Sequence, residues 1–130
     1  MKLPLFSAAI LLTALVGCND SKTSKMTENT ENNPLLVEST LPYGAPNFSK
    51  IKDVHYRPAL LKGMALQNER IAAIANSNET PTFENTIIAL EKSGVELERA
   101  SAVFNALTEA NTNDTLKVLQ KELSPKFAEH

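Results

Sequence analysis

The stretch from Thr80 to Phe104, TPTFENTIIALEKSGVELERASAVF, decides the fold, because apolar and small residues recur in it at alternating spacings of four and three. This period places them on one side of an α-helix. We expect a single helix that ends near Glu109 and is about 40 Å long at 1.5 Å per residue. Its seam consists of Phe83, Ile87, Leu90, Gly94, Leu97, Ser101 and Phe104.

The start of this helix carries the usual N-terminal signals. Thr80 or Thr82 can cap it, with Pro81 in or just before the first turn. Glu84 lies where the helix dipole favours a negative charge. A helix of this length is stable only with a partner along its side, and the preceding helical segment is the nearest candidate. The two would form a long antiparallel hairpin.

The partner helix is expected to run from Val54 to Asn76. Asp53 is a plausible N-cap; Arg57 as the cap, with Pro58 at the first helical position, is the competing boundary. Gly63 weakens the helix but permits close packing. The apolar stripe consists of Leu60, Met64, Ile71 and Ile74, and is widened by Leu61, Ala65 and Ala72.

A third helix follows the break at 111–114, where Asn and Asp residues can cap it. Pro125 predicts that this helix kinks or ends near Glu122. Its apolar stripe consists of Leu116, Leu119, Leu123 and Phe127. Nothing in the chain reads as a strand, so the predicted fold class is all-α: a long antiparallel helical hairpin plus a third helix, within residues 54–130. Residues 34–53 predict an extended, proline-containing arm. The arm and the third helix lack an evident partner, so we expect both to expose apolar surface.

The N-terminus, MKLPLFSAAILLTALVGCND, resembles a bacterial lipoprotein signal. A short apolar run of signal-peptide length ends in Leu-Val-Gly before Cys18, the one cysteine of the chain. We expect a signal peptide at 1–17, lipidation at Cys18 and a flexible polar tether at 18–33. A plain secretory signal is the alternative. The expected location is the bacterial cell envelope, lipid-anchored and periplasm-facing. The outer membrane is slightly favoured because Asn19, rather than an aspartate, follows the cysteine.

The composition excludes some functions and offers no catalytic site. The formal net charge of −2 and the scattered basic residues do not indicate nucleic-acid binding. His55 and His130 are the two histidines, too few for a zinc site, and no HExxH, CxxC or GxSxG motif occurs. No catalytic or metal-binding residue is therefore assigned, and the substrate-binding residues are left open. The helical carboxylates are expected to be solvated, with ordinary pairs such as Glu96 with Arg99.

Three segments nevertheless resemble a known family. They are LPYGAPNFSKIKDVHYRPALLKGM (Leu41–Met64), TPTFENTIIALEKSG (Thr80–Gly94) and ELSPKFAEH (Glu122–His130). They are similar to the N-terminal region of the thimet oligopeptidase-like zinc metallopeptidases, in particular the bacterial peptidyl-dipeptidase and oligopeptidase A branch. The resemblance covers about Asn33 to His130.

The resemblance implies an incomplete part of a larger helical peptidase fold, whose N-terminal helices help to wall a channel for short peptides. In that family the zinc site lies far downstream on an HExxH helix. None of those positions occurs in this sequence, so no zinc or catalytic residue is carried over, and zinc is expected only in a full-length family member.

Two functions follow from these observations. The first is the N-terminal, non-catalytic part of an envelope-associated zinc metallo-oligopeptidase of the peptidyl-dipeptidase type. It would hydrolyse short peptides when full-length and be inactive as these 130 residues alone. The alternative is a small lipid-anchored helical binding module without enzymatic activity.

Overall fold

The computed structural model describes residue 30 and residues 32–130. Cys18, the signal peptide at 1–17 and all but the end of the 18–33 segment lie outside the described residues. Those that are described form helices and turns without a strand, which confirms the all-α class. None of their helices is long and apolar enough to cross a membrane.

Helix α1 spans Asp53–Ala75, one residue earlier than expected at each end. Its N-cap is Lys52 rather than Asp53, and the side-chain Nδ1 of His55 accepts a hydrogen bond from the Lys52 amide at 3.0 Å. The competing boundary at Arg57 is wrong, because Pro58 lies inside the helix. A proline in the second turn removes only one backbone hydrogen bond, and the adjoining side chains of Ala59 and Leu60 are fully buried.

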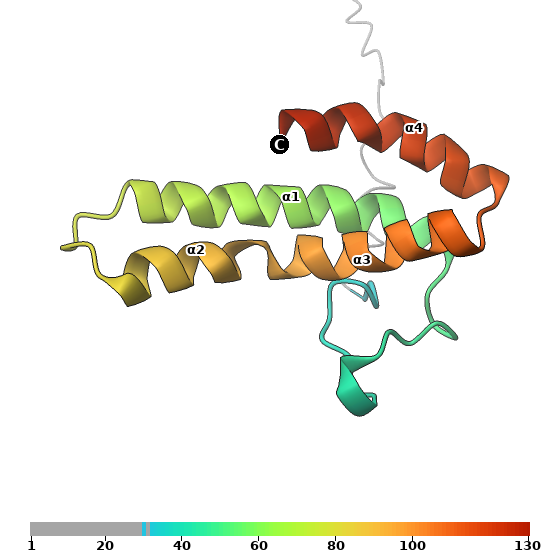
Figure 1. The fold of residues 1–130 in the computed structure, drawn as a ribbon, viewed down its shortest axis with the longest axis horizontal. Coiled ribbons are helices and arrows are strands. Elements are labelled where there is room, and N and C mark those ends of the chain that lie inside the picture. The colour runs from blue at the N-terminus through green and yellow to red at the C-terminus, as the bar shows by residue number, and fades with distance from the viewer. Residues whose placement is uncertain (1–29, 31) are drawn as a thin grey trace, which may run out of the picture.

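The antiparallel hairpin is confirmed: α1 packs along α3 (Val95–Ala110), and the two run in opposite directions in Figure 1. Gly63 lies at the closest approach. A Cβ atom added there would be 2.8 Å from the Cα of Leu97. Farther along, Gly94 receives the side chain of Gln67, whose Nε2 would be 2.6 Å from a Cβ at that glycine. The two glycines let the helices approach more closely than side chains would permit.

The second arm of the hairpin is not one α-helix. It begins as the π-helix η2 (Phe83–Ile88), passes through the short α2 (Ala89–Glu91) and the 3₁₀ turn η3 (Lys92–Gly94), and then continues as α3. Of the two expected caps, Thr80 and Thr82, the structure uses Thr82, whose Oγ1 accepts a hydrogen bond from the Asn85 amide at 3.1 Å.

The single continuous seam predicted for this segment is wrong in its first half. Phe83, Ile87 and Leu90 are 63%, 51% and 48% exposed, whereas Phe104 is buried and Leu97 packs against the core. A π-turn closes i→i+5 hydrogen bonds and takes more residues per turn than an α-turn. It therefore rotates the following side chains off the stripe that a 3.6-residue period predicts.

Helix α4 spans Asp114–Glu129 and is capped by Asn113, whose Oδ1 accepts a hydrogen bond from the Leu116 amide at 2.9 Å. The sequence predicts that this helix kinks or ends near Glu122; it does not end there, because it continues past Pro125. Packing compensates for the lost backbone bond: Leu123 is fully buried and Phe127 packs against the core.

One core joins the arm to three helices. Helix α4 lies over one side of the hairpin and the arm lies on the other (Figure 1). The third helix therefore has a partner, contrary to expectation, although Val118 on its outer face is 66% exposed. The core residues are Leu35, Ile51, Tyr56, Ala59, Leu60, Ala100, Val103, Phe104, Leu116, Leu119 and Leu123.

The arm is a series of turns rather than an extended segment, with a short 3₁₀ helix, η1, at Pro42–Gly44. Its ends enter the core through Leu35 and Ile51. Its middle exposes the large apolar side chains expected of it, namely Val37, Leu41, Tyr43 and Phe48.

The core occupies only one half of the hairpin. Every residue from Ala65 to Lys92 is exposed or partly exposed. In α1 the expected stripe therefore holds for Leu60 and Met64, which are buried, and fails for Ile71, which is 38% exposed. The half of the hairpin that carries η2 consists of two segments with no third layer over them (Figure 1).

Candidate functional site

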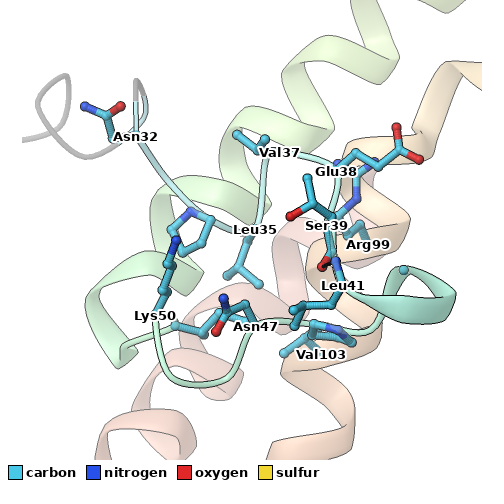
Figure 2. A pocket seen from close by; sticks show the side chains of 15 residues that line it. Asn32, Leu35, Val37, Glu38, Ser39, Leu41, Asn47, Lys50, Arg99 and Val103 are labelled. Atoms are coloured by element: carbon cyan, nitrogen blue, oxygen red, sulfur yellow. Dashed lines mark hydrogen bonds between the residues drawn. The ribbon is translucent and has the colours of Figure 1, made fainter.

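A recess with a volume of about 300 Å³ lies between the arm and α3. Leu35, Ile51 and Val103 give it an apolar lining that continues into the core. Glu38, Lys50 and Arg99 supply charge. In Figure 2 Lys50 lies on the opposite side of the recess from Glu38 and Arg99.

Asn33 fixes the first side of this pocket. It is 1% exposed, its Nδ2 donates to the backbone oxygen of His55 at 2.8 Å, and its Oδ1 accepts from the Leu35 amide at 3.0 Å. A buried amide with both ends bonded is well satisfied. Asn33 therefore belongs to the folded region, although its polarity placed it with the preceding 18–33 segment.

A tight turn fixes the other side of the pocket. Tyr43 and Gly44 both adopt positive φ, at 60° and 66°. The Ser39 hydroxyl donates to the Ala45 backbone oxygen at 2.6 Å and accepts from the Leu41 amide at 3.2 Å, so it closes the loop around them. A tyrosine in the left-handed region is strained, and its side chain is fully exposed.

The pocket offers charged and apolar groups that a ligand could contact. Neither Lys50 nor Arg99 forms an ion pair with another residue in the described part of the chain. No nucleophile stands beside a general base among the lining residues, which are otherwise aliphatic, amide or hydroxyl side chains. An apolar recess with two cations and one carboxylate at its edges can receive a side chain or a short segment of another chain.

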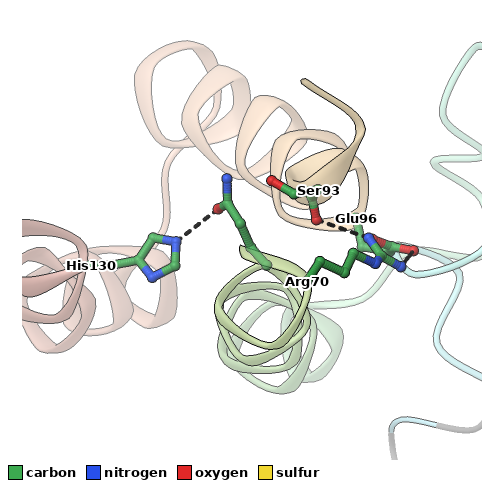
Figure 3. Close-up of polar contacts among 5 residues, drawn as sticks. Arg70, Ser93, Glu96 and His130 are labelled. Atoms are coloured by element: carbon green, nitrogen blue, oxygen red, sulfur yellow. Dashed lines mark hydrogen bonds and ion pairs between the residues drawn. The ribbon is translucent and has the colours of Figure 1, made fainter. Parts of the chain in front are cut away.

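A second polar cluster joins the two arms of the hairpin (Figure 3). The guanidinium of Arg70 binds Glu96 with two hydrogen bonds, of which the Nη2–Oε1 bond is 2.8 Å long, and donates from Nη1 to the Ser93 backbone oxygen at 2.9 Å. The hydrogen bond from Arg70 holds the pKa of Glu96 below its ordinary value and raises that of Arg70. The expected Glu96–Arg99 pair is therefore wrong, since Arg99 acts on Glu96 only through its charge.

The histidines do not gather into a metal site. The Nδ1 of His55 is bonded to the Lys52 amide, and the Nε2 of His130 lies 2.8 Å from the Oε1 of Gln67 (Figure 3). In residues 32–130 no three histidine, cysteine or acidic side chains are close enough to hold a metal ion together. The described residues thus do not fit the zinc site that the family resemblance implies for a full-length member.

Sequence reasoning missed this pocket, because its residues come from parts of the chain that are far apart. Arg99 and Val103 are on α3, whereas Glu38 and Lys50 are on the arm. The one available signal was the presence of Pro34, Pro42 and Gly44 within a short segment. These residues indicate turns but not what the turns enclose. Cys18, the one predicted modification site, is outside the described residues.

Comparison with known proteins identifies homologues. Over 97 residues, which are 75% of this chain, it is 52% identical to the dipeptidyl carboxypeptidase of Escherichia coli (strain K12). Over 96 residues it is 49% identical to the dipeptidyl carboxypeptidase of Salmonella typhimurium (strain LT2). The chain spans 14% of the length of each of these relatives. No protein-family model matches it.

Proposed function

We propose that this chain is the N-terminal, non-catalytic part of an envelope-associated zinc metallo-oligopeptidase of the peptidyl-dipeptidase type. The observation that carries the proposal is the 52% identity over 97 residues to a dipeptidyl carboxypeptidase. The absence of an HExxH motif from the sequence is consistent with a non-catalytic part. In this proposal zinc and short peptide substrates belong to the full-length enzyme.

The contribution of this region is structural. The α1–α3 hairpin, with α4 and the arm packed on it, would form part of the wall around the peptide channel that the family resemblance implies. The lipid at Cys18 would hold the enzyme at the membrane surface facing the periplasm, with the outer membrane favoured.

The proposal is tested by the intact mass of the native product, purified from the cell envelope with an antibody raised against residues 33–130. We expect a mass several times that of the 14.2 kDa chain. We also expect release of dipeptides from the C-termini of short peptides, lost with a chelator and restored by zinc. A large product without this activity would contradict the proposed reaction.

A second function is favoured by the shared core. The arm, α1, α3 and α4 bury one cluster of side chains among themselves, as a domain that folds alone would. This observation supports a small lipid-anchored binding module that uses the pocket between the arm and α3. A native mass equal to that of acylated Cys18–His130, with a monomeric and protease-resistant product, would favour the module over the peptidase.

A further inference from the structure

The η2 and α2 segments carry three large exposed apolar side chains, Phe83, Ile87 and Leu90, here named the distal stripe. These side chains are 63%, 51% and 48% exposed. They lie at the end of the hairpin where no residue from Ala65 to Lys92 is buried. In Figure 1 this end lies away from the arm, and α4 contacts the range through His130, which bonds to Gln67. Large exposed apolar side chains that recur at spacings of four and three on a half-covered hairpin are typical of an interaction surface.

The π-helical backbone of η2 helps to explain why the side chains of the distal stripe are exposed. A regular α-helix would have aimed the same residues at α1, as their 4–3 spacing predicts. In this structure Phe83 and Ile87 lie on a π-helix and are more than half exposed, whereas Ser93, farther along the same arm, is 1% exposed. Thr82 and Asn85 hold the first turn of η2 with reciprocal hydrogen bonds of 3.1 and 2.8 Å. Such π-turns are frequent at functional sites.

The acidic residues around the distal stripe indicate the charge that its partner surface should carry. Glu79, Glu84 and Glu91 are all exposed there, against the single exposed cation Lys92. The one other base at this end, Arg70, is bonded to Glu96. A second copy of the chain would bring two acidic rims together, and an anionic membrane would repel the rim. The complementary surface is an apolar protein face bordered by lysine or arginine.

We propose that the distal stripe docks on such a face within the same longer polypeptide, in the part that lies outside this segment. This inference rests on the proposed function. The relatives supply the reason for an intramolecular partner, because the chain spans only 14% of their length. The stripe thus joins this region to the body of the enzyme.

A chimaera tests the proposal. The aligned 97-residue segment of the Escherichia coli relative is replaced by the corresponding residues of this chain. Ile87→Ser and Leu90→Ser are introduced together into the chimaera and into the free 130-residue chain. Val118→Ser is the matched control, since Val118 is 66% exposed on α4, away from the stripe.

We expect the double substitution to lower the Tm of the chimaera by about 3 °C or more and that of the free chain by clearly less. About half of each side chain is already covered in the free chain, and only the chimaera buries the rest. The control should change neither protein. Glu84→Lys with Glu91→Lys should also destabilise the chimaera alone, by opposing the basic border. Equal effects in both proteins, or none in the chimaera, overturn the proposal. A wild-type chimaera that does not fold overturns it as well.

Release of dipeptides by the chimaera separates this inference from the proposed function. If the double substitution lowers the Tm of the chimaera but the wild-type chimaera releases no dipeptides, the docking surface is supported and the proposed function is contradicted. If the chimaera releases dipeptides but its Tm does not respond to the double substitution, the function is supported and the docking surface is contradicted.

Discussion

Arg70 and Glu96 show how one ion pair makes the stability of the hairpin depend on pH. Because the hydrogen bond from Arg70 lowers the pKa of Glu96 from its ordinary 4.5, the unfolded chain binds a proton more readily than the folded protein does. The stabilisation is fully present above pH 4.5 and is lost as the pH falls through the lowered pKa of the folded state.

Glu96→Gln should therefore lower the free energy of unfolding near pH 7 by about 1 kcal/mol, a modest value because the Arg70 side chain is 38% exposed. The difference from the wild type should shrink as the pH falls below 4.5. Urea unfolding at several pH values measures both quantities. A difference that stays constant down to pH 3 would show that the pair does not shift the pKa of Glu96.

Replacing Gly63 by alanine would change the stability of the protein in two opposite ways, through helix propensity and through packing. Alanine is favoured over glycine in a helix by about 1 kcal/mol. At this position, however, the added Cβ would lie 2.8 Å from the backbone Cα of Leu97, which cannot yield as a side-chain end can. Overpacking costs about 1–3 kcal/mol, so Gly63→Ala should be destabilising overall, as measured by thermal unfolding. Asn68→Ala, at an exposed position of the same helix, is the control and should be neutral or slightly stabilising.

At the scale of an element, helix α4 shows that packing on the core can keep a helix intact across an internal proline. Pro125 lies inside the helix, where it removes a backbone hydrogen bond, yet the helix runs on to Glu129. Leu123 and Phe127 on either side hold it to the core. Pro125→Ala should then stabilise the protein by about 1 kcal/mol or more, since it restores that bond without disturbing an exposed site. Chemical denaturation measures the change, and an unchanged midpoint would mean that α4 is unstrained at Pro125.

The elements also show what the sequence can and cannot predict. Within residues 32–130, periodicity found the long helical segments. The capping preferences of Thr82 and Asn113 were correct because those bonds are local. The π-turn was missed because its residues, FENTII, keep an α-helical spacing of apolar side chains. The buried position of Asn33 and the pocket around Arg99 were missed because both depend on contacts between segments far apart in the chain.

At the scale of the whole described fold, residues 32–130 divide into a half with a packed core and a half without one, and the two should differ in local stability. The core residues of α1 end at Met64, and Ala65–Lys92 contains no buried residue. Helical hydrogen bonds without a covering layer open at low free-energy cost. In the free chain, backbone amides of 66–75 and 84–91 should exchange with solvent faster than those of 57–64 and 100–107. Hydrogen exchange monitored by mass spectrometry tests this, and uniform protection along the hairpin would contradict it.

The bond between Asn33 and the His55 carbonyl has a mechanical consequence. It fastens the incoming N-terminal chain to the first turn of α1, at the packed half of the molecule. In a lipid-anchored protein, tension on the anchor would reach the fold at this point. From this point the 23 residues of α1 extend about 35 Å. The core covers only the first half of that length, so the load would be carried there, while the distal stripe lies toward the uncovered end.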